Sequence, residues 1–238
     1  MFDQQETYIN FQLKNSCEII KYDLFSPVVY IGGIDVSFVE QGKDLTSFVG
    51  VGALVILEYN TLNVVYSDCV EMTIDIPYVP GFLGFREEPF AKLLFNRLMT
   101  TNPMVCPQII LIDGCGIYHP RRFGSASQIG LSLDIPTIGI SKSFLKLEEL
   151  NENDFIIKDS NDEMRPFELN VISNGELLAV AIYSGTSKHP SCYISIGNRI
   201  SLKSAIEIVK HCSKFKIPEP IRQADLLSRE AVRIKMNK

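Results

Sequence analysis

Three apolar segments rich in β-branched residues follow one another at residues 28–39, 47–59 and 62–74. This composition is typical of β-strands, because branched side chains pack well on a pleated surface. Only the polar residues Asn60 and Thr61 separate the second segment from the third. A connection this short allows two strands to pair only in the antiparallel sense. The sequence therefore predicts a three-stranded antiparallel meander.

From residue 88 onward, helical and extended patterns alternate. Residues 88–98 carry apolar side chains at the helical period. Residues 108–113 form a continuous apolar run, which is typical of buried parallel strands. The alternation continues with a helix over 124–133, strands over 136–141, 176–184 and 191–197, a helix over 202–212 and a last helix from about residue 222. We expect one α/β domain over 1–238, with a central mixed sheet of three antiparallel strands followed by parallel strands, flanked by helices.

Two parts of the chain fall outside this alternation. Residues 1–26 are predicted to form a lead-in helix before the first strand. Residues 145–170 are rich in charge and have no clear period, so we expect a hairpin or a loop insertion there.

Composition excludes several classes of protein. No apolar run approaches the roughly 18 residues that a membrane span needs, and acidic residues within 1–26 do not fit a signal peptide. The six cysteines form no CxxC pair, which argues against a zinc knuckle and favours reduced thiols. A net charge of −5 argues against a protein that coats nucleic acid regardless of sequence. We expect an intracellular monomer, cytoplasmic, nuclear or both, with no membrane partner.

Three carboxylates occupy positions where an α/β sheet collects functional groups. Asp35 lies in the first predicted strand, Asp113 closes the 108–113 run, and Glu87 stands at a predicted helix start. Function gathers beyond the carboxyl ends of strands, where Asp35 and Asp113 would meet. Two carboxylates at so short a distance can both stay ionised only if a cation lies between them. Mg²⁺ suits this role, because it binds both carboxylate and phosphate oxygens. For each acid taken singly, a hydrogen-bonded turn or cap is the alternative interpretation.

The stretch PYVPGFLGFREEP at residues 77–89 combines prolines, glycines and aromatic rings directly before paired carboxylates. Pro77 and Pro80 restrict the backbone around Tyr78, so that ordering its ring loses little entropy. Such a ring can stack on exposed bases. The alternative is an aromatic loop that packs into the core.

Four motifs occur in the order found in a known family. They are YIGGIDVSFV, PYVPGFLGFREEPF, LIDGCGIYHPRRFGSASQIGLSLDIPTIGISKS and IPEPIRQAD. Over roughly residues 27–235 the chain therefore resembles endonuclease V, an inosine-directed nuclease family with a ribonuclease H-like fold. The combination is highly specific, although a short piece such as GIDVS would be weak evidence alone.

This resemblance implies a catalytic set of four acids and one lysine. Asp35, Asp113 and Glu87 match the family's ligands for Mg²⁺, for which Mn²⁺ can substitute. Asp225 stands where bacterial members carry a metal-binding histidine, and in this the chain is similar to the animal branch. Lys142 matches the lysine that contacts a phosphate near the cleaved bond.

The resemblance also implies a wedge and a base pocket. In the family, the PYxP segment is pushed into the nucleic acid beside the inosine, because a base must leave the stack before its edge can be read. The implied wedge and pocket residues are Pro77, Tyr78, Val79, Pro80, Gly81, Gly84, Gly114, Cys115, Gly116, Gly124 and Ser125. The two glycines after the wedge would permit close approach of the backbone to the displaced base.

The motif HPRRFG is the only dense basic sequence near these segments. His119, Arg121 and Arg122 are its candidates for phosphate contact, and a solvated charged turn is the alternative for the arginines. A weaker candidate for backbone contact is the loop over 195–201.

Three positions depart from the family pattern. Many members have asparagine where Cys115 stands, and histidine where Gln128 and Asn198 stand. We expect Cys115 to be a wall of the pocket, because no histidine pairs with it in the manner of a nucleophile. The acids are all present, so an active enzyme is expected.

The activity implied by the resemblance is metal-dependent hydrolysis of the phosphodiester one nucleotide 3′ of an inosine, leaving 5′-phosphate and 3′-hydroxyl ends. Single-stranded RNA is the expected substrate, as for animal relatives, with DNA as a second substrate. The alternatives are a non-cleaving inosine-RNA binding protein, a DNA-repair deoxyribonuclease acting on deoxyinosine, and a general structure-specific nuclease.

Overall fold

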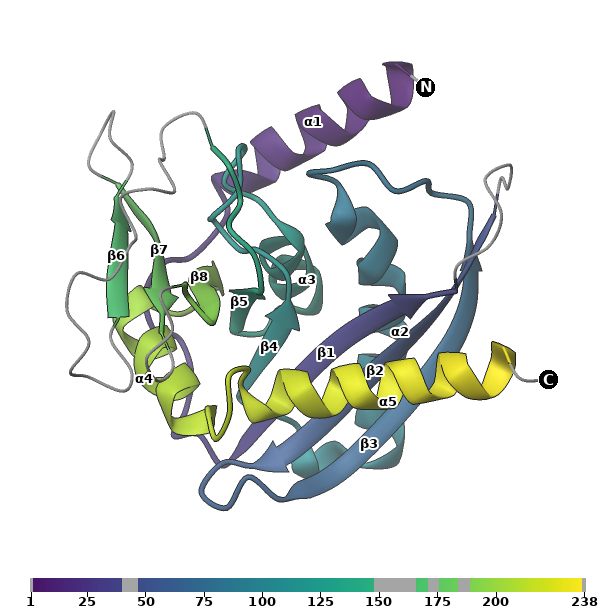
Figure 1. The fold of residues 1–238 in the computed structure, drawn as a ribbon, viewed down its shortest axis with the longest axis vertical. Helices are drawn as coiled ribbons and strands as arrows, with labels where there is room; N and C mark the ends of the chain where they lie inside the picture. The colour runs from purple at the N-terminus through teal and green to yellow at the C-terminus, as the bar shows by residue number, and fades with distance from the viewer. Residues whose placement is uncertain (1, 40–46, 148–165, 171–175, 184–188, 237–238) are drawn as a thin grey trace.

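A computed structural model describes residues 2–39, 47–147, 166–170, 176–183 and 189–236. Its strands form an eight-stranded sheet in the order β3-β2-β1-β4-β5-β8-β7-β6 (Figure 1). The strands are β1 Tyr30–Phe38, β2 Phe48–Glu58, β3 Val64–Ile74, β4 Ile109–Asp113, β5 Thr137–Ser141, β6 Pro166–Asn170, β7 Leu177–Ile182 and β8 Cys192–Asn198.

Strand directions confirm the predicted mixed sheet. β1, β2 and β3 form an antiparallel meander. β4 pairs in parallel with β1, and β5 in parallel with β4. β8 then returns antiparallel to β5, and β7 and β6 continue antiparallel. The parallel part is therefore confined to the centre, where the strands are buried on both faces.

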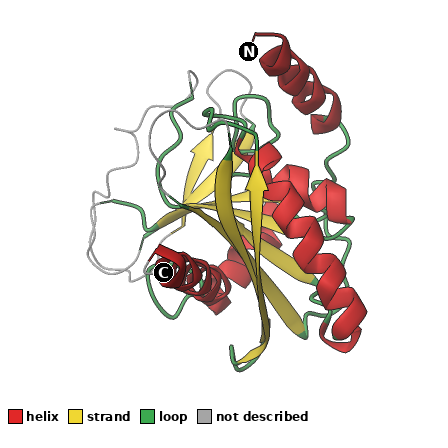
Figure 2. Cartoon of the chain, turned by 90° about the vertical axis from the view of Figure 1, so that its right-hand side faces the viewer, coloured by secondary structure: helices red, strands yellow, loops and turns green. Residues whose placement is uncertain are grey.

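Helices cover both faces of this sheet. They are α1 Phe2–Ser16, α2 Leu83–Thr101, α3 Ser125–Leu133, α4 Leu202–Cys212 and α5 Glu219–Met236, with a short 3₁₀ helix at Pro103–Val105. α5 crosses one face over β1 and β2, while α2 lies on the other face (Figures 1 and 2). None of the helices in the described ranges has the length and apolarity that a membrane span requires.

The side chains of β2 show how the sheet builds two cores. Leu54 and Ile56 are fully buried in the core beneath α2. Val55 and Leu57, one position along, belong to the core that also contains Ile221 of α5. Successive side chains of a strand point to opposite faces, so a continuous apolar run buries both.

Two predicted boundaries are wrong. The lead-in helix predicted over 1–26 ends at Ser16. The chain that follows is held by the end of β8, since the Arg199 N–H donates to Ile20 O at 2.7 Å and the Leu24 N–H donates to Arg199 O at 3.0 Å. α2 begins at Leu83, not at residue 88, so Glu87 lies inside the helix.

Most of the predicted hairpin or insertion over 145–170 lies outside the described residues. Of its described part, residues 166–170 form β6, which pairs with β7.

Candidate functional site

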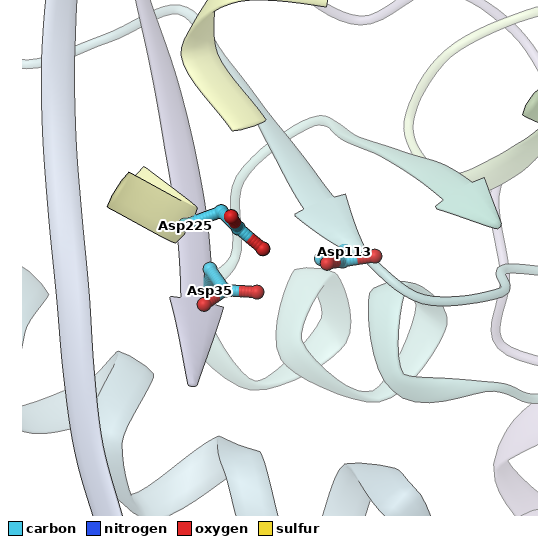
Figure 3. Close-up of side chains that lie close together, drawn as sticks. All are labelled: Asp35, Asp113 and Asp225. Atoms are coloured by element: carbon cyan, nitrogen blue, oxygen red, sulfur yellow. The ribbon is translucent and has the colours of Figure 1, made fainter. Parts of the chain in front are cut away.

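Three aspartates from distant parts of the chain converge at one point. Asp35 lies on β1, Asp113 ends β4, and Asp225 lies on α5. One carboxylate oxygen of each lies within 4.8 Å of the others. Figure 3 shows the three side chains directed toward one another. The arrangement offers a cation a set of hard oxygen ligands.

The parallel pairing of β1 with β4 brings the first two acids together. Ile34 of β1 lies opposite Ile112 of β4. Asp35 and Asp113 are the next residues along these strands, so both stand at the same edge of the sheet. This confirms the predicted proximity of the two acids.

A glycine allows α5 to bring the third acid close. A Cβ atom on Gly33 would lie 2.1 Å from the carbonyl oxygen of Pro220 in the first turn of α5. Only a glycine permits so short a distance between the strand and the helix backbone. Asp225 follows Pro220 on the same helix, and so its distance to Asp35 depends on this contact.

Hydroxyl groups fix the Asp35 carboxylate. Ser228 Oγ donates to Asp35 Oδ2 at 2.6 Å, and Ser37 Oγ lies 2.8 Å from Ser228 Oγ. Asp35 is 8% exposed. The carboxylate is therefore oriented before any ligand arrives.

Lys142 lies against the other two acids. Its Nζ is 2.5 Å from Asp113 Oδ2 and 3.0 Å from Asp225 Oδ1. Burial alone would lower the pKa of Lys142, but Asp113 and Asp225 raise it, so the ammonium remains charged. The lysine thus balances part of the negative charge and stands where it can meet a phosphate.

Lys142 offsets part of the negative charge of the cluster, and the exposed Arg229, with Nη2 2.9 Å from Asp225 Oδ1, offsets a further part. Burial raises the pKa of Asp113 to about 7; Lys142 opposes the rise and Asp35 adds to it. Burial, Asp113 and Asp35 also raise the pKa of Glu87 well above its usual range, while Ser125 and Arg86 oppose the shift. Glu87 does not belong to the group of three aspartates, but the charges of Asp113 and Asp35 act on its carboxyl group. Surplus charge on oxygen donors fits Mg²⁺ or Mn²⁺.

These shifts predict how Mg²⁺ affects stability at different pH. A carboxyl whose pKa is raised by folding stabilises the folded state while protonated, and this contribution is lost as pH rises through about 7. The metal-free protein should therefore melt at lower temperature at about pH 8 than at about pH 6, and Mg²⁺ should raise Tm more at about pH 8.

Calorimetry with Mg²⁺ or EDTA at the two pH values measures this effect. Asp113→Asn should reduce the pH dependence, because the variant lacks the titrating group. An equal Mg²⁺ effect at both pH values would contradict the prediction.

A pocket of about 310 Å³ adjoins the cluster and shares Asp113 and Lys142 with it. The predicted wedge, pocket and basic residues that line it are Tyr78, Pro80, Gly81, Gly84, Gly114, Cys115, His119, Gly124 and Ser125. The lining residues that the sequence analysis missed are Gln12, Leu83, Ser141, Ser143, Phe144 and Leu145. Ser141 and Ser143 are the neighbours of Lys142 in the sequence, and this position is the one feature that points to them before the structure is known.

The remaining predicted residues have other surroundings. Pro77, Val79, Gly116, Arg121 and Arg122 do not line this pocket. A Cβ on Gly116 would lie 1.8 Å from Ile196 O, so this glycine packs directly on β8. Arg122 Nε donates to Glu176 Oε2 at 3.2 Å.

His119 and Arg121 do not face outward. They bind the loop of residues 77–82, the wedge segment, which contains the PYxP motif and Gly81. His119 Nε2 lies 3.0 Å from Gly81 O, and Arg121 Nη2 donates to the same oxygen at 2.9 Å. Burial and Arg121 lower the pKa of His119 to about 4, which keeps its ring neutral near pH 7. The basic motif therefore joins the loop after β4 to the wedge segment.

The aromatic loop divides between solvent and core. The Tyr78 side chain is 63% exposed, whereas Phe82 is buried. The Arg86 guanidinium lies 4.0 Å from the Phe38 ring centroid and 5.8 Å from that of Tyr78. The core-packing interpretation therefore holds for Phe82, while Tyr78 presents its ring to solvent.

At two of the three positions that depart from the family pattern, the side chain forms a hydrogen bond within the protein. Gln128 Nε2 donates to Glu88 Oε2 at 2.6 Å. Asn198 Oδ1 accepts from the Ile20 N–H at 3.1 Å. Cys115 lines the pocket, and burial raises its pKa to about 11, so it is a neutral thiol. That state suits a wall residue rather than a nucleophile.

Comparison with known proteins agrees with this geometry. The endonuclease V family model matches residues 13–226. Mouse endonuclease V is 39% identical over 214 residues, which are 88% of this chain and 61% of the mouse protein. The solved catalytic domain of human endonuclease V is 34% identical, with a TM-score of 0.86 and coverage of 99% of this chain and 98% of that one.

A Ciona intestinalis endonuclease V was solved with a 24mer DNA that contains an inosine followed by a ribo-adenosine. It is 30% identical, with a TM-score of 0.89 and coverage of 97% of this chain and 98% of that one. The family model spans most of the sequence, and the site described above lies within its limits apart from Gln12 and Ser228. The chain belongs to the endonuclease V family and has its ribonuclease H-like fold.

Proposed function

We propose that the protein is a divalent-metal-dependent endonuclease that recognises inosine in single-stranded RNA, with DNA as a second substrate. It hydrolyses the phosphodiester one nucleotide 3′ of the inosine and leaves 5′-phosphate and 3′-hydroxyl ends. The Ciona complex with inosine-containing DNA supports the choice of base. At Asp225 the chain is similar to the animal branch of the family, and this similarity supports the choice of RNA.

The observation that carries the proposal is the shared wall between pocket and acidic cluster. Asp113 belongs to both, and Gly114 and Cys115 continue from it along the pocket. A base held in the pocket would bring a neighbouring phosphate close to the carboxylates, and we infer from the resemblance to the family that this phosphate lies on the 3′ side. Recognition and hydrolysis at neighbouring nucleotides follow from that arrangement.

Asp35, Asp113 and Asp225 would hold the metal ion, with Glu87 completing the acidic shell. Mg²⁺ or Mn²⁺ at this point would supply Lewis-acid stabilisation of charge on the phosphate oxygens. Lys142 balances the same charge from the other side. Ser228 keeps Asp35 in the required orientation.

The pocket selects its base by shape and by backbone groups. Hypoxanthine lacks the exocyclic amino group of guanine, so a close-fitting wall can exclude guanine. Gly114 and Ser125 both line the pocket and are packed closely together, since a Cβ on Gly114 would lie 2.0 Å from Ser125 Oγ. Peptide groups of the loop after β4 can then read the base edge.

A panel of matched oligonucleotides tests this function. RNA and DNA strands containing inosine or adenosine are incubated with the protein in Mg²⁺, Mn²⁺ or EDTA. We expect products only from inosine strands, only with metal, and faster from RNA. End analysis should give a 5′-phosphate at the position one nucleotide beyond the inosine.

Each alternative predicts a different result on the same panel. Binding of inosine strands with no products in either metal would indicate a non-cleaving reader. Equal cleavage of inosine and adenosine strands would indicate a general nuclease. Cleavage of deoxyinosine strands alone would indicate a DNA-repair enzyme.

Tyr78→Ala tests the proposed wedge. Stacking on a base contributes about 1–3 kcal/mol, so the variant should lose about 5- to 150-fold in kcat/KM on a paired inosine strand. On an unpaired strand the loss should be smaller, because fewer base contacts must be broken. Tyr78→Phe keeps the ring and is the matched control. An unchanged rate of Tyr78→Ala on duplex would reject the wedge.

A further inference from the structure

One carbonyl group of the wedge segment accepts hydrogen bonds from three separate side chains. Gly81 O accepts a hydrogen bond from Gln12 Nε2 at 2.9 Å and another from Arg121 Nη2 at 2.9 Å, and His119 Nε2 lies 3.0 Å from the same oxygen. The His119 ring donates here, since its Nδ1 accepts from the Arg121 N–H at 3.2 Å. Gly81 has φ +83°, a conformation that glycine adopts readily. The position of this peptide is therefore fixed from outside its own loop.

Gln12 connects the other members of this group. Its Nε2 also lies 3.2 Å from Phe123 O, and its Oε1 accepts from Arg121 Nε at 2.5 Å. The residue lines the pocket but is 1% exposed. Both ends of its carboxamide are engaged within the protein, so it is not arranged to read the base.

Aromatic contacts anchor α1, which carries Gln12, to the first turn of α2 and to the loop after β4. Tyr8 stacks on Phe85 with ring centroids 4.0 Å apart. Phe11 contacts Phe85 at 5.3 Å and Phe123 at 6.1 Å. α1 lies beyond the end of the sheet toward which β4 points (Figures 1 and 2). The helix thus joins the wedge side of the pocket to the loop after β4.

We propose that Gln12 is a positioning residue that fixes the wedge relative to the base pocket, an inference that rests on the proposed function. Its amide holds Gly81 O to the loop at Phe123, and its oxygen orients Arg121 onto the same carbonyl. The Tyr78 ring then projects into solvent from a backbone that is already ordered. A preordered wedge loses less entropy on insertion, so Gln12 matters most when the inosine is paired.

Gln12→Met tests this role, because methionine has a similar shape and no amide. The matched control is Asn10→Leu, which makes a polar-to-apolar change at an exposed position of α1. We expect Gln12→Met to lose about tenfold in kcat/KM on a paired inosine strand and less than about threefold on an unpaired one. Asn10→Leu should leave both values unchanged.

Two further readouts separate positioning from general loss of stability. A 2-aminopurine beside the inosine brightens when it is unstacked, and Gln12→Met should reduce that signal on duplex at saturating protein. Hydrogen exchange of the free protein should show faster exchange of the Phe82 N–H, which donates to Val79 O at 3.1 Å.

If Gln12→Met does not fold, Gln12→Glu carries the test. It keeps the acceptor for Arg121 but places an oxygen against Gly81 O and Phe123 O. The ratio of paired to unpaired rates should fall in this variant as well.

An unchanged ratio in a folded variant, or equal losses on both substrates, would overturn the inference. If the unaltered protein cleaved no inosine strand, the proposed function would fail, and the exchange rates alone would still decide whether Gln12 orders the wedge segment.

Discussion

Asp35→Asn should lower the cleavage rate by on the order of 10³-fold or more. Its amide cannot supply the negative charge that a metal site requires, and losing several kcal/mol of charge stabilisation corresponds to such a factor. The fold should persist, since Ser228 Oγ can still donate to the amide oxygen. Single-turnover cleavage of an inosine RNA strand in Mg²⁺ measures the effect.

Stability provides an independent readout for the same variant. Asp35 contributes to the raised pKa values of Asp113 and Glu87. Removing its charge should therefore leave Tm in EDTA unchanged or higher. Asp68→Asn, which alters an aspartate on β3 outside the cluster, should cleave normally. Substantial cleavage by a folded Asp35→Asn protein would remove Asp35 from the mechanism.

Gly33→Ala should impair both stability and cleavage. The added methyl group would lie 2.1 Å from Pro220 O and 2.3 Å from its carbonyl carbon, and backbone atoms cannot move aside cheaply. Forcing α5 away from β1 should lower the free energy of unfolding by about 1–3 kcal/mol. Asp225 would move with the helix, and a displacement of about 1 Å in a catalytic group can reduce the rate about 100-fold.

Gly32→Ala is the matched control. Its added carbon would meet the side chains of Ile110, Ile56 and Pro107 at 3.1–3.4 Å, which can adjust by a few tenths of an ångström. Denaturant unfolding and cleavage rates of the two variants should differ clearly. Equal stability and equal rates would contradict the view that close contact of α5 with β1 sets the acidic cluster.

The sheet could be predicted because its signals are local. Short polar turns and branched residues identified β1 to β3, and the apolar run ending at Asp113 identified β4. The start of α2 was missed, because Gly84 and Pro89 lie within it and both oppose a helix locally. Its packing on α3 overrides them: a Cβ on Gly84 would lie 2.5 Å from Gln128 Oε1. Such long-range contacts leave no pattern in a single sequence.

The site was predictable to the extent that its residues share strand ends or motifs. Asp35 and Asp113 followed from strand position, whereas Asp225 came only from the resemblance, since nothing local marks a helix as facing β1. Arg121 is a candidate for phosphate contact or for a solvated turn because only its charge is visible in the sequence, and its partner Gly81 lies 40 residues away. Gln12 carried no signal, because its role depends on contacts between three distant segments.

Anomalous diffraction from crystals soaked in Mn²⁺ tests the convergence of the acids most directly. We expect a manganese peak about 2–2.3 Å from carboxylate oxygens of Asp35, Asp113 and Asp225, beside the pocket. Carboxylates turned away from one another, with no manganese peak among them, would contradict this expectation.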